Sequence, residues 1–189
     1  MLSASTPTFA TCALRSAPIF GPNDPACIPT LHSCIAAAQM PFILGTGTNL
    51  QDYVYVDNVA HAHVLAVDNL LQSQTAAGEA IFISNGEPVT VRQLCLAAWK
   101  HFGHVPAFEV TVPERLAWGL AWGLEWVGWV TGTEGLLSCG LVSDGCRVRY
   151  VNLDKARRIL GYRARVGLEE GLRRSCEWYR GLLENRARR

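Results

Sequence analysis

Lysine is scarce in this sequence, and a long uninterrupted apolar run is missing from it. Lys100 and Lys155 are the only lysines among 189 residues, and the net charge of +1 gives no strong positive field to attract nucleic acid. The apolar stretch 116–130 includes Glu125 and would extend only about 22 Å as a helix, against the ~30 Å of a bilayer core. We therefore expect no nucleic-acid partner and no membrane-spanning helix.

Cysteine and histidine spacing excludes two further kinds of site. The seven cysteines are odd in number, and no two have the C-x-x-C spacing of zinc sites and redox motifs. Most lie in apolar surroundings, which suits buried thiols in a reducing compartment. His61 and His63 would point to nearly opposite sides of a helix, so no metal site is expected. The first ten residues do not resemble a signal peptide, so the protein is not expected to be secreted.

Short β-forming runs alternate with helical patterns, which indicates an α/β fold. Residues 11–14 form an apolar run typical of a buried strand, and Pro18 and Gly21 then force an irregular loop. In open α/β sheets ligands bind at the carboxyl ends of strands, so this loop is a candidate site. The Gly-x-Gly at 45–47 has no third spaced glycine, and it predicts a hairpin turn instead of a phosphate loop.

Helix signals recur along the rest of the chain. Asp57 is expected to cap a helix that ends near residue 72, and Thr90 and Gln93 have the spacing of a capping box. The other expected helices are 25–40, 113–130, 153–160 and one from residue 168. The expected strands are 11–14, 42–44, 52–56, 80–84 and 108–112.

The helix expected at 113–130 has an unusual distribution of aromatic residues. Four indoles fall within an arc of about 80° on a helical wheel, and aliphatic side chains occupy the opposite side. The indoles are Trp118, Trp122, Trp126 and Trp129. The aliphatic side is expected to pack on the protein. For the indoles three explanations stay open: burial on both sides, a wall for a large flat apolar substrate, or contact with a bilayer interface.

Basic residues are concentrated after residue 150. There the chain has Lys155 and ten arginines against five acidic residues, whereas the first 150 residues are acidic overall. An apolar stripe at i, i+4, i+8 and i+11 predicts a terminal helix with its arginines outside. The stripe is Leu168, Leu172, Cys176 and Tyr179. The arginines indicate either a solvated helix face or contact with anionic lipid headgroups.

Several segments resemble one known family in the same order along the chain. CALRSAPIFGPND resembles the LRPxxIYGPGD segment of extended short-chain dehydrogenases, and DYVYVDNVAHAHVLA resembles their DFVYVDNVAxAHxLA segment. The match continues through AIFISNGEPVTVRQL, VPERLAW and YVNLDKARRILGYRARVGLEEGLRRSCEWY. The chain is thereby identified as similar to the 3β-hydroxysteroid dehydrogenase family, in particular its sterol-4α-carboxylate 3-dehydrogenase (decarboxylating) branch.

The resemblance implies a fold, a reaction and a division of the chain. The fold would be the C-terminal part of a Rossmann-type sheet over residues 1–77, followed by a small α/β substrate lobe over 78–189. In such enzymes NAD or NADP takes a hydride from a sterol or triterpenoid 3β-hydroxyl, and C-4 decarboxylation can follow. The loop Ala17, Pro18, Ile19 and Phe20 would border the nicotinamide. The four indoles would contact substrate or membrane on the cytoplasmic side of the endoplasmic reticulum.

Two motifs of that family are missing from this sequence. No GxxGxxG phosphate loop occurs, and neither lysine completes YxxxK, because the residues four positions before them are Leu96 and Val151. The resemblance thus implies the C-terminal half of a family member, and we expect no 3β-hydroxysteroid oxidation by these 189 residues alone. The alternative is a non-catalytic sterol- or membrane-binding module, which could pair with an intact homologue.

Overall fold

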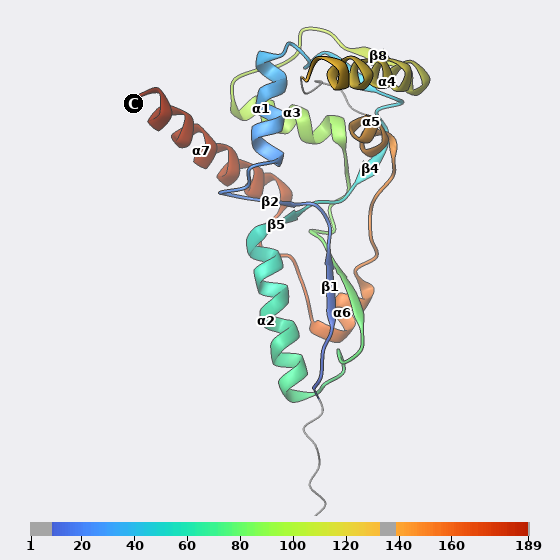
Figure 1. Ribbon diagram of the computed structural model, residues 1–189. Coiled ribbons are helices and arrows are strands. Elements are labelled where there is room, and N and C mark those ends of the chain that lie inside the picture. Colours follow the sequence, from blue (N-terminus) through green and yellow to red (C-terminus); the bar gives the residue numbers. More distant parts are fainter. Residues whose placement is uncertain (1–8, 133–138, 189) are drawn as a thin grey trace, which may run out of the picture.

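The computed structural model of the chain describes residues 9–132 and 139–188 (Figure 1). Its strands form four short pairs. β1 (Ala13–Ser16) pairs in parallel with β6 (Ala80–Ile83), and β2 (Ile19–Phe20) with β5 (Val54–Tyr55). β3 (Phe42–Leu44) pairs in parallel with β8 (Val110–Val112), whereas β4 (Leu50–Gln51) and β7 (Val89–Thr90) are antiparallel.

Seven helices in the described ranges surround these strands. They are α1 (Cys27–Ala36), α2 (Val56–Gln72), α3 (Val91–His101), α4 (Glu114–Thr131), α5 (Cys139–Cys146), α6 (Asp154–Leu160) and α7 (Leu168–Ala187). In Figure 1, α2 and α6 lie beside β1 at one end of the molecule, and α1, α3, α4 and α5 lie at the other. The short pair β2–β5 lies between the two ends, next to the start of α7.

Three buried clusters follow this arrangement. The first joins β1, β6, α2 and α6, and includes Ile81 and Tyr162. The second is formed by β2, β5, α1, α3 and α7 around Phe20 and Leu172. The third is small and lies beneath α4, where Ala117, Ala121 and Val142 meet.

The structure confirms several predicted local features. Gln93 N donates to Thr90 Oγ1 at 3.1 Å and Thr90 N donates to Gln93 Oε1 at 2.9 Å, so the capping box of α3 is present. The whole predicted stripe of α7 is buried, and its arginines lie outside. There, hydrogen bonds from Arg173 and Arg174 lower the pKa of Glu170 to about 2. These exposed ion pairs contribute little to stability.

Three local predictions are wrong. The first strand begins at Ala13 and is only half-covered, since the face that carries Arg15 is exposed, with its guanidinium 5.9 Å from the Phe82 ring centre. The 45–47 turn joins no hairpin, because β3 pairs with β8 and β4 with β7. The helix predicted to start after Asp57 begins at Val56, and Asp57 lies in its first turn, where a carboxylate favours the positive end of the helix dipole.

A group of hydrogen bonds is centred on Asn58, which is fully buried near the start of α2. Its Nδ2 donates to Asn85 Oδ1 at 2.8 Å and to Val166 O at 2.7 Å. Its Oδ1 accepts from the backbone N–H of Arg165 at 2.8 Å and of Val166 at 3.1 Å. Asn85 Oδ1 also accepts from Tyr55 N. Asn58 thereby ties α2, the end of β6 and the segment before α7 together.

Candidate functional site

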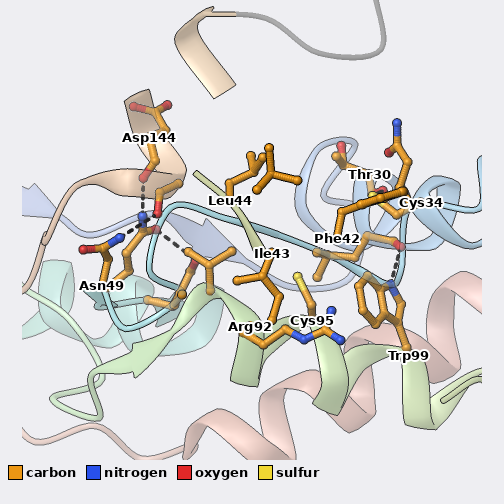
Figure 2. A pocket seen from close by; sticks show the side chains of 18 of the residues that line it. Thr30, Cys34, Phe42, Ile43, Leu44, Asn49, Arg92, Cys95, Trp99 and Asp144 are labelled. Atoms are coloured by element: carbon orange, nitrogen blue, oxygen red, sulfur yellow. Dashed lines mark hydrogen bonds between the residues drawn. The ribbon is translucent and has the colours of Figure 1, made fainter. Parts of the chain in front are cut away.

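A cavity of about 530 Å³ lies between α1, β3 and α3, with α4 and α5 at its edge. This volume is in the range of small-molecule sites, roughly 300–1,000 Å³. Figure 2 shows Asn49 and Asp144 at one end of the cavity and Thr30, Cys34 and Trp99 at the other. Its apolar wall includes Leu31, Phe42, Ile43, Leu44, Val91, Val112 and Leu120.

The polar groups of the cavity are largely used within the protein. Tyr53 Oη donates to Gln51 Oε1 at 3.0 Å, and Gln51 Nε2 donates to the carbonyl oxygen of Asp144. Trp99 Nε1 donates to Leu31 O at 2.7 Å (Figure 2). Since these donors already have acceptors, the cavity favours a ligand that needs few hydrogen bonds.

The one arginine of the lining is neutralised by its neighbours. The Arg92 side chain is only 10% exposed, and it donates to Glu109 Oε1 at 2.9 Å and to Met40 O at 2.6 Å. Its guanidinium lies 5.4 Å from the ring centre of Trp99. Arg92 therefore holds α3 against the segment before β3, and its charge is compensated before any ligand arrives.

The thiols of Cys34 and Cys95 and the phenol of Tyr53 in the cavity wall are poor nucleophiles and bases. Burial raises the pKa of Cys95 to about 12 and also raises the pKa of Cys34. Burial, with Cys27 and Cys95 nearby, raises the pKa of the Tyr53 phenol. All three side chains are protonated near neutral pH, so none of them is prepared to act as a base for hydride transfer.

The four residues expected to border a nicotinamide have different surroundings. Ala17 N donates to Ile83 O at 2.8 Å, and Pro18 O accepts from Val54 N at 3.0 Å, so the loop runs along the ends of β6 and β5. Pro18 and Ile19 are exposed, but Ala17 is buried and Phe20 is only 1% exposed, packed edge-to-face on Tyr55. Only Pro18 and Ile19 present side chains to the surface.

The orientation of α4 differs from the prediction. The helix packs through its small residues Ala117 and Ala121 against α5, β3 and β8. Both its aromatic and its aliphatic sides are exposed, from 40% at Trp118 to 83% at Trp129 and 62% at Leu116. Small side chains allow the backbones to approach closely, which turns the larger side chains outward. Burial on both sides is thereby wrong for this helix, and none of the four indoles lines the cavity.

The cavity residues were not predicted as a group, although one signal was available. Arg92, Cys95 and Trp99 are spaced i, i+3 and i+7 along α3 and so share a face. Their contacts with β3 and α1 depend on segments some 50 to 68 residues away in sequence, as the Arg92–Met40 and Trp99–Leu31 hydrogen bonds illustrate. The single-helix pattern cannot supply that pairing.

The placement of potential metal ligands and the character of the helices bear on metal binding and membrane crossing. Within residues 9–132 and 139–188, no three His, Cys, Asp or Glu side chains are arranged to hold a metal ion. In the same part of the chain, none of the helices combines the length and apolar character needed to cross a bilayer.

Solved structures define the class of fold. UDP-glucose 4-epimerase from Thermotoga maritima, crystallised with UDP-glucose, superposes with a TM-score of 0.61 at 26% identity, over 90% of this chain and 46% of that one. dTDP-glucose 4,6-dehydratase from Bacillus anthracis, in complex with NAD, has the same fold at a TM-score of 0.58 and 18% identity, over 90% and 45%. The predicted Rossmann-type extended short-chain dehydrogenase fold is thus confirmed.

Sequence relatives identify the family. Residues 1–113 match the family described as "3-beta hydroxysteroid dehydrogenase/isomerase family". The sterol-4-alpha-carboxylate 3-dehydrogenase (decarboxylating) of Schizosaccharomyces pombe is 40% identical over 94% of this chain, and that of Mus musculus is 30% identical over 98%. This chain belongs to the 3-beta hydroxysteroid dehydrogenase/isomerase family. It spans about half the length of these relatives, 53% in both cases.

Proposed function

We propose that this chain supplies the substrate-binding part of an oxidoreductase that oxidises the 3β-hydroxyl of a sterol or triterpenoid, with loss of a C-4 carboxyl group. The observation that carries the proposal is the apolar cavity, in which Tyr53 Oη and Trp99 Nε1 already donate to acceptors of the protein. A rigid multi-ring ligand with few polar atoms suits such a wall. The names of the relatives, sterol-4-alpha-carboxylate 3-dehydrogenases, supply the substrate class.

NAD or NADP would accept the hydride in this reaction, and the described residues fit one border of such a cofactor. Pro18 and Ile19 are exposed where β1 ends, which is the edge at which open α/β sheets bind ligands. We propose that these two residues face the nicotinamide, whereas the buried Phe20 and Ala17 hold their backbone in place. The glycine loop and the catalytic tyrosine and lysine that the family uses have no counterpart in this sequence.

We also propose that the two parts of the chain have different roles. Residues 1–77 would contribute to the cofactor part and residues 78–189 to the substrate lobe. β6 pairs with β1 across this boundary, so the two parts share a sheet. Within the described residues no second strand pairs with β1. Its outer edge would pair with a further strand of the Rossmann-type sheet, from an additional segment or an intact homologue.

Sterol binding by the purified chain tests the proposal. We expect a fluorescent sterol delivered on cyclodextrin to bind with saturable polarisation, and I43W to weaken its affinity about tenfold or more by filling the cavity. V64W adds slightly more bulk than I43W, at an exposed position of α2, and is expected to bind as the unchanged chain does. Equal affinities for I43W and V64W would contradict a sterol site in this cavity.

The alternative function is a non-catalytic sterol- or membrane-binding module at the cytoplasmic face of the endoplasmic reticulum. It is favoured by the protonated wall groups and by the exposed indoles of α4, Trp118, Trp122, Trp126 and Trp129. We expect the purified chain to produce no NADH or NADPH from a 3β-hydroxysterol. Turnover above background that is lost in I43W but kept in V64W would refute this expectation.

A further inference from the structure

The outward surface of α4 carries no charge over most of its length. Glu114 and Arg115 lie in its first turn, and the next charged residue is Glu125. Glu125 Oε1 accepts a hydrogen bond from Cys139 N at 2.7 Å, so this carboxylate is engaged by the N-terminus of α5. From Leu116 to Trp129 the exposed side chains are leucines, indoles and Val127, with Gly119 exposed between them and Glu125 as the single charged residue.

This exposed surface is continuous with the rim of the cavity. Leu120 is 59% exposed on α4 and also lines the cavity. Phe42 on β3 is 51% exposed and lines the same cavity. Both side chains thus have one part against the cavity and another at the surface. The rim of the cavity is therefore apolar on both α4 and β3.

A bilayer interface suits this surface better than a protein partner. Protein interfaces usually have a polar rim and about one hydrogen bond per 100–200 Å². Here the exposed polar groups are the Glu125 carboxylate, which already accepts from Cys139 N, and the indole N–H groups. Indole N–H groups are favoured at the level of lipid headgroups while the rings contact the acyl region. A helix whose exposed sides are Leu and Trp fits in the plane of such an interface.

We propose that α4 lies on the bilayer with the cavity opening toward the lipid, so that an apolar ligand enters from the membrane between Leu120 and Phe42. This inference rests on the proposed function, since it presumes that the cavity binds a sterol-like ligand. It adds a route: the ligand leaves the bilayer without crossing water. Trp122 and Trp126 provide attachment, whereas Leu120 belongs to both the attachment surface and the opening.

Vesicle experiments with the full chain test the route. Phosphatidylcholine vesicles that carry a fluorescent sterol are mixed with the chain, and two quantities are measured: the fraction attached by flotation, and sterol transfer per attached chain. We expect W122Q/W126Q to lose attachment about tenfold, because two exposed indoles no longer enter the interface. The control V64Q/L71Q alters two exposed apolar residues of α2 and is expected to attach normally.

Leu116 and Leu120 allow a matched test of whether the ligand enters at the cavity rim. They are 62% and 59% exposed on the same helix, but only Leu120 lines the cavity. L116Q and L120Q should lower attachment equally, and L120Q alone should slow transfer per attached chain, about fivefold. Equal transfer by the two variants would overturn the route.

The remaining outcomes separate the two proposals. A chain that takes sterol from cyclodextrin but ignores vesicles would overturn the membrane route and leave the proposed function intact. Failure to take sterol from either source would overturn both. Concentration-dependent dimers that W122Q/W126Q abolishes, without vesicle attachment, would assign the surface to a second copy of the chain and overturn the route.

Discussion

N58D is expected to lower the free energy of unfolding by about 4 kcal/mol at neutral pH. Asn58 is fully buried, and its Nδ2 donates to Asn85 Oδ1 and Val166 O. A carboxylate there would face two acceptors with no donor and would carry a buried charge. The backbone N–H groups of Arg165 and Val166 would still have an acceptor, so the loss comes from the missing Nδ2 donor and from the buried charge. Urea unfolding followed by far-UV circular dichroism measures the change.

Acid and a matched variant separate this mechanism from a general loss of packing. Protonation of the introduced carboxyl removes its charge and restores one donor, so the destabilisation by N58D should shrink as the pH falls. N152D makes the same change at an exposed position, where Asn152 Oδ1 only accepts, from Asp154 N at 2.6 Å. Its effect should stay within about 0.5 kcal/mol. An N58D effect as small as that of N152D would contradict the role of the buried amide.

Asn58 belongs to the DYVYVDN segment, one of those that resemble the family, and its hydrogen bonds show that this segment stabilises the fold. In the DYVYVDN segment, Val54 and Tyr55 are buried, Asn58 makes four hydrogen bonds, and Tyr53 lines the cavity. Most of this segment holds the fold together, and only Tyr53 of these four residues contacts the candidate site. A family can therefore be identified from residues that stabilise the scaffold, while the ligand is bound by others.

Local signals predicted local structure well in this chain. The capping box at Thr90 and Gln93 depends on contacts within three residues, and the stripe of α7 follows from residue spacing within one helix; both are confirmed. The helix 113–130 was also predicted to within one residue at each end. Its orientation was not, because hydrophobicity on a wheel ranks Leu and Trp above alanine. The face that packs on the protein is instead the one with small side chains, Ala117 and Ala121, which allow close contact.

Pairings over long sequence distances could not be predicted in the same way. The apolar run 42–44 indicated a strand, but nothing in it identifies residues 110–112 as the partner. The hairpin expected at 45–47 followed from proximity in sequence, whereas the two strands beside it pair elsewhere. The cavity forms where β3, α1 and α3 meet, so it is a product of those same pairings. Its lining was accordingly outside the reach of local patterns.

G171V is expected to destabilise the chain by about 3 kcal/mol, through overpacking at the contact between α7 and β2–β5. A first side-chain carbon at this position would lie 2.9 Å from Tyr55 Cδ2 and 3.0 Å from Phe20 Cε2 and Cζ. Both rings are buried and packed against each other, with centres 5.7 Å apart, so neither has room to withdraw. Displacement of Phe20 would also move Ile19, which precedes it in β2 and is proposed to face the nicotinamide. The midpoint of urea unfolding measures the loss.

Gly181 provides the matched control on the same helix. A side-chain carbon there would meet nothing within 4 Å. G181A should therefore stabilise the chain by up to ~1 kcal/mol, because alanine favours the helix and the unfolded chain loses freedom. G171A receives the same helix benefit, but its side-chain carbon still lies too close to the two rings. Its free energy of unfolding should therefore fall between those of G181A and G171V. If G171A were as stabilising as G181A, the rings would have room to move, and the close contact of α7 with β2–β5 would not be what requires glycine at 171.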